Sequence, residues 1–195
     1  QTTRYAGKGG FDEGRFEDAK QILLKKYEII ENSSDPNKKK RLLNNLGICY
    51  IKSNIQADVE KGIEYLKSAL DLDPDFDQPK LNLIAHYTGK GIVDKFSDVL
   101  DYAKELYDKS PDNLEYVGTL TYSYYINNKI SEAILLIKKL DKTLFAQNEN
   151  LCSAIALAYH AHDNLKKAEE VIESALKNFS NSINLNHLKG INLVL

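Results

Sequence analysis

The stretch RLLNNLGICY, residues 41–50, carries the pattern that decides the fold. Leu43, Leu46 and Tyr50 follow one another at spacings of three and four positions, so an α-helix would place all three side chains on one face. Gly47 lies on the same face and has no side chain, which would let a second helix approach closely. The stretch therefore predicts a buried helix that packs tightly against another helix.

A tyrosine equivalent to the one that ends this pattern recurs three more times along the chain. Tyr50, Tyr87, Tyr124 and Tyr159 are separated by 37, 37 and 35 residues. Self-similarity at such a period is typical of a stacked array of helical repeats. Similar apolar residues precede each later tyrosine, in the order Leu83-Ile84-x2-Tyr87, Val117-x2-Leu120-Thr121-x2-Tyr124 and Cys152-x2-Ile155-Ala156-x2-Tyr159. Because they belong to this packing pattern, the following residues are expected in the core: Leu46, Tyr50, Tyr87, Leu120 and Tyr124.

A second helix is expected after each tyrosine. Small and large apolar residues recur there at helical spacing, in Gly62-x3-Leu66-x2-Ala69, Ala133-x3-Ile137 and Ala168-x3-Ile172-x2-Ala175, with an earlier copy around Ala19 and Leu23. The third copy is irregular, because Val99, Ala103 and Leu106 exchange the small and large positions. Pro74 and Pro111, again 37 residues apart, are expected to end two of these second helices.

The acidic stretch DLDPDFD, residues 71–77, lies at one junction between helical pairs. Its alternating aspartates look like the start of an EF-hand calcium loop. The sequence does not complete that loop, because Phe76 replaces the glycine of the sharp turn and Asn82 replaces the bidentate glutamate. The stretch is instead expected to join two helices, with Asp75 and Asp77 capping exposed amides at the start of the second.

These repeated units resemble the tetratricopeptide repeat, a helix-turn-helix unit of about 34 residues. The resemblance implies an all-α solenoid of about five repeats, forming a single domain over residues 1–195. No copy has tryptophan at the first aromatic position. The second and third copies hold three extra residues after the tyrosine, which either lengthen a helix or form a protruding turn. The expected repeats span approximately 1–34, 38–74, 77–111, 114–145 and 148–180, with a closing helix over 182–195.

Both ends of the array depart from the pattern. YAGKGG, residues 5–10, has three glycines, each costing about 1 kcal/mol in a helix interior, so the first helix is expected to be frayed or truncated. The apolar end INLVL, residues 191–195, indicates that the array continues or that a partner covers it. The chain begins at Gln1 and contains no Met, which indicates a processed chain or a piece of a longer protein.

The resemblance implies that the first helix of each repeat lines a concave groove. Asn45 and Asn82 share one repeat position, and their amides could pair with the backbone of a peptide. Tyr122 and Tyr125 would offer flat amphipathic surfaces, as binding hot spots do. The alternative is that these four are ordinary helix residues. The full set of expected peptide-binding residues is Arg41, Asn45, Gln78, Asn82, Tyr122, Tyr125 and His160.

One kind of ligand is not expected in this groove. Relatives that grip the acidic C-terminus of chaperones use a clamp of lysine, asparagine and arginine. Here the basic members of that clamp are mostly replaced, by Asn44, Ile48, Gln78, Glu115 and Thr119. A peptide recognised by its terminal carboxylate is therefore not expected to be the main ligand of the groove.

The composition is that of an ordinary globular protein, with 43% hydrophobic and 28% charged residues and a net charge of −2. No basic excess points to nucleic acid, and no apolar run is long enough for a membrane span. The two cysteines, Cys49 and Cys152, are interpreted as small buried side chains. They favour a reducing compartment such as the cytoplasm. A periplasmic or secreted protein that has lost its signal peptide stays open.

No motif indicates an enzyme, a cofactor or a metal. AGKGG and TGKGI lack the spacing of a phosphate-binding loop, so their glycines are interpreted as turn or helix-end residues. His160 and His162 are two positions apart, which on a helix points them in different directions; His160 is expected on the groove side and His162 near the turn. The basic run KKKR, residues 38–41, is interpreted as a solvated helix start.

The sequence therefore predicts a non-enzymatic scaffold or adaptor that binds a protein or peptide in the groove. The alternative is a recognition or regulatory module of a larger enzyme or sensor. Self-association through the ends of the array is a third possibility.

Overall fold

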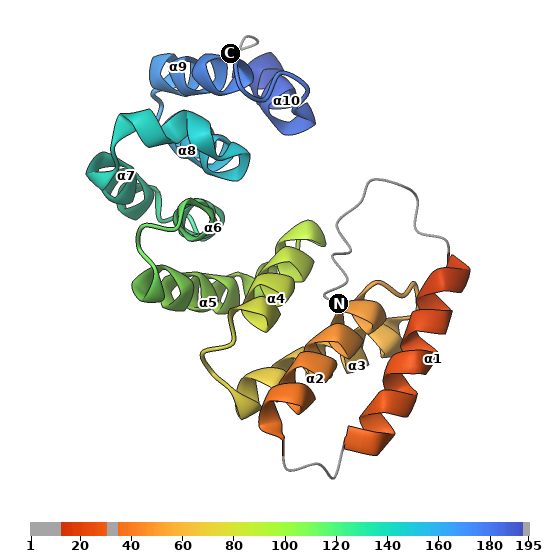
Figure 1. The fold of residues 1–195 in the computed structure, drawn as a ribbon. Helices are drawn as coiled ribbons and strands as arrows, with labels where there is room; N and C mark the ends of the chain where they lie inside the picture. The colour runs from red at the N-terminus through yellow and green to blue at the C-terminus, as the bar shows by residue number, and fades with distance from the viewer. Residues whose placement is uncertain (1–12, 31–34, 193–195) are drawn as a thin grey trace. The chain divides into compact units, whose positions relative to one another are not determined.

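The computed structural model describes residues 13–30 and 35–192, and every regular element in those ranges is helical (Figure 1). The array is therefore the all-α helical-repeat solenoid that the sequence predicts. The glycine-rich start and the last three apolar residues lie outside the described ranges. The elements are α1 (Glu13–Ile30), α2 (Pro36–Ile51), α3 (Gln56–Leu72), α4 (Asp77–Gly89), η1 (Val93–Lys95), α5 (Phe96–Lys109), α6 (Leu114–Ile126), α7 (Ile130–Lys139), η2 (Lys142–Gln147), α8 (Glu149–Ala161), α9 (Leu165–Leu176) and α10 (Ile183–Asn192).

The helices form two compact units, one within residues 1–86 and one within residues 87–195. The first holds α1, α2, α3 and most of α4, and the second holds the end of α4 and all later elements. The grouping of all repeats into one domain, with the boundaries given above, stays a prediction. Within the described residues, no helix is both long and apolar enough to cross a membrane.

Two glycines bring α2 and α3 into close contact in the first unit. A Cβ atom on Gly47 would lie 2.5 Å from Cγ of Leu66, and one on Gly62 would lie 2.6 Å from the backbone nitrogen of Ile51. No side chain fits at such separations. The close approach predicted at Gly47 is therefore confirmed, and Gly62 is its counterpart on the second helix.

Aromatic and aliphatic side chains join α1 to this pair. Leu23, Leu24 and Tyr27 of α1 pack against the buried cluster of Leu42, Leu46 and Tyr50 on α2. Tyr65 of α3 completes the cluster, with its ring edge-on to the rings of Tyr27 and Tyr50 at centroid distances of 6.1 and 5.4 Å. Edge-on aromatic pairs add to the burial of apolar area, so this cluster is the core of the first unit.

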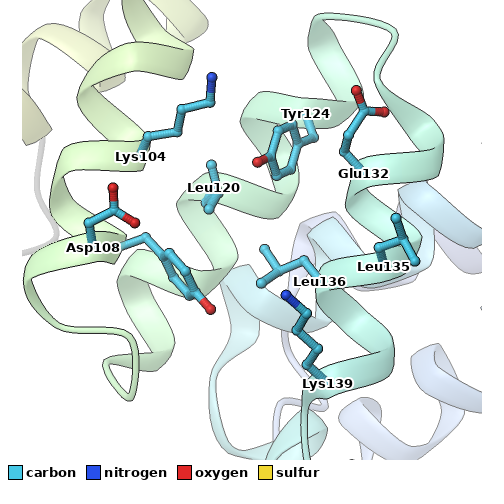
Figure 2. A pocket seen from close by; sticks show the side chains of 9 residues that line it. Lys104, Asp108, Leu120, Tyr124, Glu132, Leu135, Leu136 and Lys139 are labelled. Carbon is cyan, nitrogen blue, oxygen red and sulfur yellow. The ribbon is translucent and has the colours of Figure 1, made fainter.

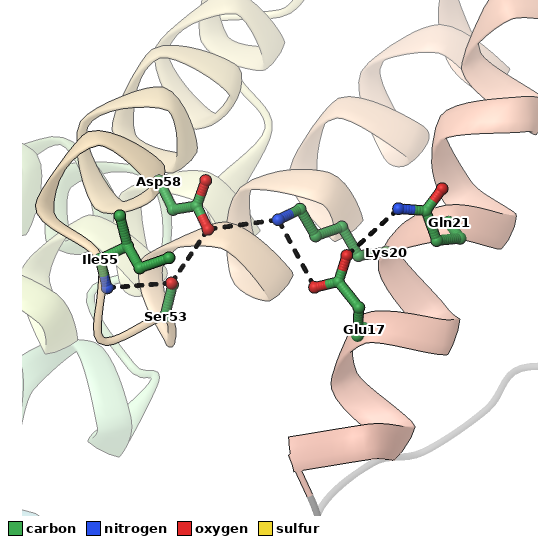
Figure 3. A network of polar contacts seen from close by, with 6 residues as sticks. All are labelled: Glu17, Lys20, Gln21, Ser53, Ile55 and Asp58. Atoms are coloured by element: carbon green, nitrogen blue, oxygen red, sulfur yellow. Dashed lines mark hydrogen bonds and ion pairs between the residues drawn. The ribbon is translucent and has the colours of Figure 1, made fainter.

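A polar network in the first unit links α1 to the first turn of α3 and to the loop before it (Figure 3). Lys20 donates to Asp58 Oδ2 at 3.2 Å, and the hydroxyl of Ser53 donates to the same oxygen at 3.0 Å. The hydrogen bond from Lys20, followed by that from Ser53, lowers the pKa of the Asp58 carboxyl. Burial alone would lower the pKa of Lys20, but the hydrogen bond to Asp58 and the nearby negative charges raise it.

The DLDPDFD stretch makes the turn between α3 and α4. α3 ends at Leu72, before Pro74, as expected. Asp73 accepts from the backbone nitrogen of Asp75 at 3.0 Å and pairs with Lys40 of α2. Capping of α4 by Asp75 and Asp77 stays a prediction.

The KKKR run is only partly solvated, which corrects the prediction of a solvated helix start. Asp35 caps α2 by accepting from the nitrogens of Asn37 and Lys38. Lys38 lies in solvent, whereas the side chain of Lys40 is largely buried. Its Nζ lies 5.3 Å from the centre of the Phe76 ring. Lys40 therefore stabilises the turn before α4 through its contacts with Asp73 and Phe76.

The three extra residues of the second and third copies are accommodated in two different ways. In the second copy they lengthen a helix, because α3 begins six positions before Gly62, whereas α7 begins three positions before Ala133. In the third copy α5 begins three positions before Val99, and the extra residues form η1 in the turn. Gly91 in that turn has φ of +62°, which confirms that the glycines of TGKGI belong to a helix end.

The second unit is built around α6 and α8. A Cβ atom on Gly118 of α6 would lie 3.0 Å from both Cα and the backbone nitrogen of Leu151 on α8, so the two helices touch at this glycine. Thr121 fills the small position of the repeat pattern and is buried, with its hydroxyl donating to the carbonyl of Val117 at 2.8 Å. The core extends through α9 to α10, whose Leu185 is fully buried. α10 falls within the segment 182–195 that was expected to close the array, and its role as the closing helix stays a prediction.

Three of the four repeat tyrosines are buried, and the fourth is not. Tyr50, Tyr87 and Tyr159 expose 4%, 1% and 8% of their surface. Tyr124 is only half-buried and lines an open pocket between α5 and α7 (Figure 2). The prediction that Tyr124 is a core residue is therefore wrong. The physical reason is that no side chain of the described residues fills the space beside its ring.

Candidate functional site

The sequence-predicted binding residues fall into one group in each unit. In the first unit they lie on α2, as Arg41 and Asn45, and on α4, as Gln78 and Asn82. Arg41, Asn45 and Gln78 are exposed, and Asn82 is half-buried. Arg41 makes no ion pair with any described residue. This guanidinium is available to an acidic group of a ligand.

A ladder of side-chain amides links the two helices of the first group. Nδ2 of Asn82 donates to Oδ1 of Asn44 at 2.9 Å, and Nδ2 of Asn44 lies 3.5 Å from Oδ1 of Asn45. Asn44 is buried, with 6% of its surface exposed. The ladder occupies one donor of Asn82 and reaches the acceptor of Asn45. Within the described residues, the ladder leaves Oδ1 of Asn82 as an acceptor and Nδ2 of Asn45 as a donor for other groups.

The second group consists of Tyr122 and Tyr125 on α6 and His160 on α8. The two tyrosine rings lie 6.0 Å apart, tilted by 32°. Both are half-buried, and burial, followed by the proximity of Tyr125, raises the pKa of Tyr122. The pair is therefore a small, partly desolvated aromatic surface.

Two polar atoms on α8 are buried without a hydrogen-bond partner. They are Oγ of Ser153 and Nε2 of His160. Since the two residues are seven positions apart, they lie on the same face of the helix. A buried polar atom that makes no hydrogen bond costs free energy. A ligand or an ordered water that supplied the missing partners would recover it.

No site for a metal or for nucleophilic chemistry stands out in the described part of the chain. No group of three metal-binding side chains occurs there. Burial raises the pKa of the Cys152 thiol to about 11, so little thiolate forms at neutral pH. Burial also raises the pKa of Cys49, and both cysteines are unpaired thiols. Their chemistry is that of packed side chains.

Comparison with solved structures identifies the fold of these paired helices. A tetratricopeptide repeat protein of Parabacteroides merdae superposes with a TM-score of 0.72 at 16% identity, covering 93% of this chain and 67% of that one. A thermophilic protein of the same repeat class from Thermus thermophilus gives a TM-score of 0.63 at 19% identity, covering 94% and 93%. The chain has the tetratricopeptide-repeat fold. This confirms the resemblance that the repeated tyrosines indicated.

The similarity to curated protein sequences covers a smaller part of the chain than the structural similarity does. No protein-family model matches this tetratricopeptide-repeat chain. The Photosystem I assembly protein Ycf3 of Rippkaea orientalis (strain PCC 8801 / RF-1) is 29% identical over 102 residues. The match covers 51% of this chain and 56% of Ycf3, so the chain matches just over half the length of that relative.

Two features of the site were not recognised in the sequence. Asn44 was left out of the expected peptide-binding set, yet it links Asn45 to Asn82. The adjacent pair of asparagines in LLNNLG was the available signal, because consecutive helical residues point in different directions and the two amides therefore meet different surroundings. The pocket beside Tyr124 was also missed, since the tyrosine was assigned to the core.

Proposed function

We propose that this chain is a non-enzymatic scaffold that binds a protein or peptide along the faces of α6 and α8. The observation that carries the proposal is the pair of buried, unpartnered polar atoms on Ser153 and His160. These two helices pack against each other, and α6 carries the Tyr122–Tyr125 pair. The two helices thus carry aromatic area and hydrogen-bonding groups that lack partners, a combination suited to a peptide backbone with an apolar side chain.

The first unit offers a second, more polar surface of the same kind. Its Asn44 ladder fixes the orientation of the Asn45 and Asn82 amides before any ligand arrives. Orienting these amides in advance reduces the entropy that binding costs. Arg41 and Gln78 would add contacts to acidic or amide groups of the partner. The name of the relative Ycf3, an assembly protein, is in keeping with a scaffold that holds protein partners.

A peptide-display selection tests the proposal, because it requires no identified partner. Peptides selected on the whole chain should lose at least tenfold in affinity for the Tyr122→Ala/Tyr125→Ala double variant, since two hot-spot residues are removed at about 1 kcal/mol or more each. Tyr102→Ala, at a half-buried tyrosine on α5, is the matched control and should bind as the wild type does. Peptides that bind the double variant equally well would show that the ligand surface lies elsewhere.

A further inference from the structure

A pocket opens in the second unit on the side of α6 that carries Tyr124 (Figure 2). Its volume is about 350 Å³, enough for one large side chain. Leu120, Leu135 and Leu136 supply apolar walls, and the rings of Tyr107 and Tyr124 supply aromatic ones. Leu135 is one of the exposed large hydrophobic residues of the chain, with 58% of its surface in solvent. The pocket therefore suits a side chain with an apolar stem.

In two other repeats, a lysine side chain lies beside the ring of the repeat tyrosine. Nζ of Lys61 lies 5.4 Å from the centre of the Tyr50 ring, and Nζ of Lys167 lies 5.4 Å from the centre of the Tyr159 ring. Each lysine directly precedes the small residue of its second helix, Gly62 or Ala168. The fold thus places a cation over the repeat tyrosine in both copies.

In the repeat of Tyr124 this cation is replaced by an acid. Glu132 directly precedes Ala133, the small residue of α7, and so occupies the position of Lys61 and Lys167. No cation contact to the Tyr124 ring takes its place within the described residues. The side of Tyr124 that a lysine would cover is left facing the pocket.

The carboxylates around Tyr124 lack strong partners. Glu132 pairs with Lys129 alone, at 3.7 Å and with both side chains 46% exposed, a geometry of little energetic weight. Asp108 makes no ion pair or hydrogen bond with any described residue. Burial, followed by the charges of Glu132 and Asp108, raises the pKa of the Tyr124 hydroxyl. Two negative groups therefore act on one aromatic ring that has no cation beside it.

The rim of the pocket also carries two lysines. Lys104 of α5 and Lys139 of α7 line it, and neither makes an ion pair within the described ranges. Figure 2 shows the Lys139 side chain running past Leu136 toward the pocket. These lysines would repel a partner that carried only positive charge. They would attract a carboxylate placed next to the inserted cation.

We propose that this pocket binds an arginine side chain of a partner protein that has an acidic residue beside the arginine. The guanidinium would lie over the Tyr124 ring, where Lys61 and Lys167 lie over theirs, and pair with Glu132. The aliphatic stem would contact Leu120 and Leu136. The neighbouring carboxylate would pair with Lys104 or Lys139. This surface is independent of the Tyr122–Tyr125 surface.

A titration with short peptides tests the charge requirement directly. The probe is acetyl-Glu-Arg-Glu-amide, and its control has citrulline, the uncharged isostere, in place of arginine. Methyl resonances of Leu120, Leu135 and Leu136 in the whole chain are followed by NMR at millimolar peptide. The arginine peptide should give saturable shifts confined to these leucines, with an affinity at least fivefold higher than that of the citrulline peptide. Equal affinities, or shifts outside the pocket, would overturn the proposal.

A charge-reversal variant tests the place of the cation. Glu132→Lys restores the lysine found in the repeats of Tyr50 and Tyr159, so it should fill the site and abolish the shifts. The matched control is Glu170→Lys, an exposed acid of α9 in the same unit, which should bind the arginine peptide as the wild type does. If Glu132→Lys fails to fold, Glu132→Gln is used and should weaken binding at least threefold. Unchanged binding by the folded variant contradicts the proposal.

Discussion

Lys167 of α9 holds its Nζ 5.4 Å from the centre of the Tyr159 ring on α8, and Tyr159 is itself buried, exposing 8% of its surface. The same relationship recurs between Lys61 and Tyr50. In these two repeats the tyrosine therefore uses its face as a contact for a cation, in addition to its apolar packing. This makes the residue before the small position of the second helix a place where charge matters.

Lys167→Met should lower the free energy of unfolding by about 0.5–1 kcal/mol, because the stem is kept and only the cation over the ring is lost. Chemical denaturation with a linear extrapolation measures the change. Lys166→Met, at the exposed neighbouring position, is the control and should be close to neutral. Equal effects of the two substitutions would show that the ring contact adds nothing to stability.

Gly47→Ala should destabilise the first unit by about 1–3 kcal/mol, because the added methyl group would overlap the buried Leu66 side chain. The control is Gly190→Ala in α10, where nothing lies within 4 Å of the added atom. That substitution should be neutral or stabilise by up to about 1 kcal/mol, since alanine loses less backbone entropy in a helix. Thermal melts of both variants compare the two sites. A Gly47→Ala melt at the wild-type temperature would contradict the close packing.

Tyr87→Ala should cost about 3–5 kcal/mol, the usual range for a fully buried aromatic residue. Tyr124→Ala should cost clearly less, about 1–2 kcal/mol, because half-burial removes less apolar area from water. Denaturant unfolding of the two variants tests this order. Equal losses would indicate that Tyr124 is packed as deeply as the other repeat tyrosines.

The Lys20–Asp58 pair should make stability depend on acid pH. The pKa of Asp58 is lowered in the folded chain, so its contribution is full above the unfolded-state pKa of about 3.9 and is lost as the pH falls through the folded-state value. Asp58→Asn should therefore be less stable than the wild type at pH 7, and the difference should shrink toward pH 3.

The control for this pH series is the same substitution made in a Lys20→Met background, where the hydrogen bond that lowers the pKa of Asp58 most is absent. There the effect of Asp58→Asn should change less between pH 7 and pH 3. An equal change in both backgrounds would mean that Lys20 is not the partner of Asp58 in the folded chain.

Asn44→Ala should destabilise the first unit by about 1–3 kcal/mol, because it leaves the half-buried amide of Asn82 without its acceptor. The double variant Asn44→Ala/Asn82→Ala should lose less than the sum of the two single losses. A double-mutant cycle on the free energies of unfolding measures the coupling. Strict additivity would show that the amide ladder is not formed in solution.

The candidate surfaces could be predicted only in part. The position of Tyr122 and Tyr125 on one helix follows from their spacing of three, and the structure places their rings side by side. The hydrogen bonds of the asparagines could not be predicted from the sequence, because the ladder through Asn44 depends on how α2 and α4 approach each other. The unpartnered atoms of Ser153 and His160 depend on neighbouring helices in the same way. The spacing of residues indicates on which face of its helix each side chain lies. The neighbouring helices decide which hydrogen-bond partners that side chain meets.

The sequence by itself determined the repeat and the helices. Its period of 37, 37 and 35 residues and the spacing of its apolar residues can be read along the chain, and helical periodicity is a local consequence of that spacing. Only the tertiary structure decided that Lys40 is largely buried at a turn, that Gly118 is a contact between α6 and α8, and that Tyr124 opens to a pocket. The physical reason is that burial, close approach and charge pairing are set by side chains from different helices, which the order of residues along one helix does not specify.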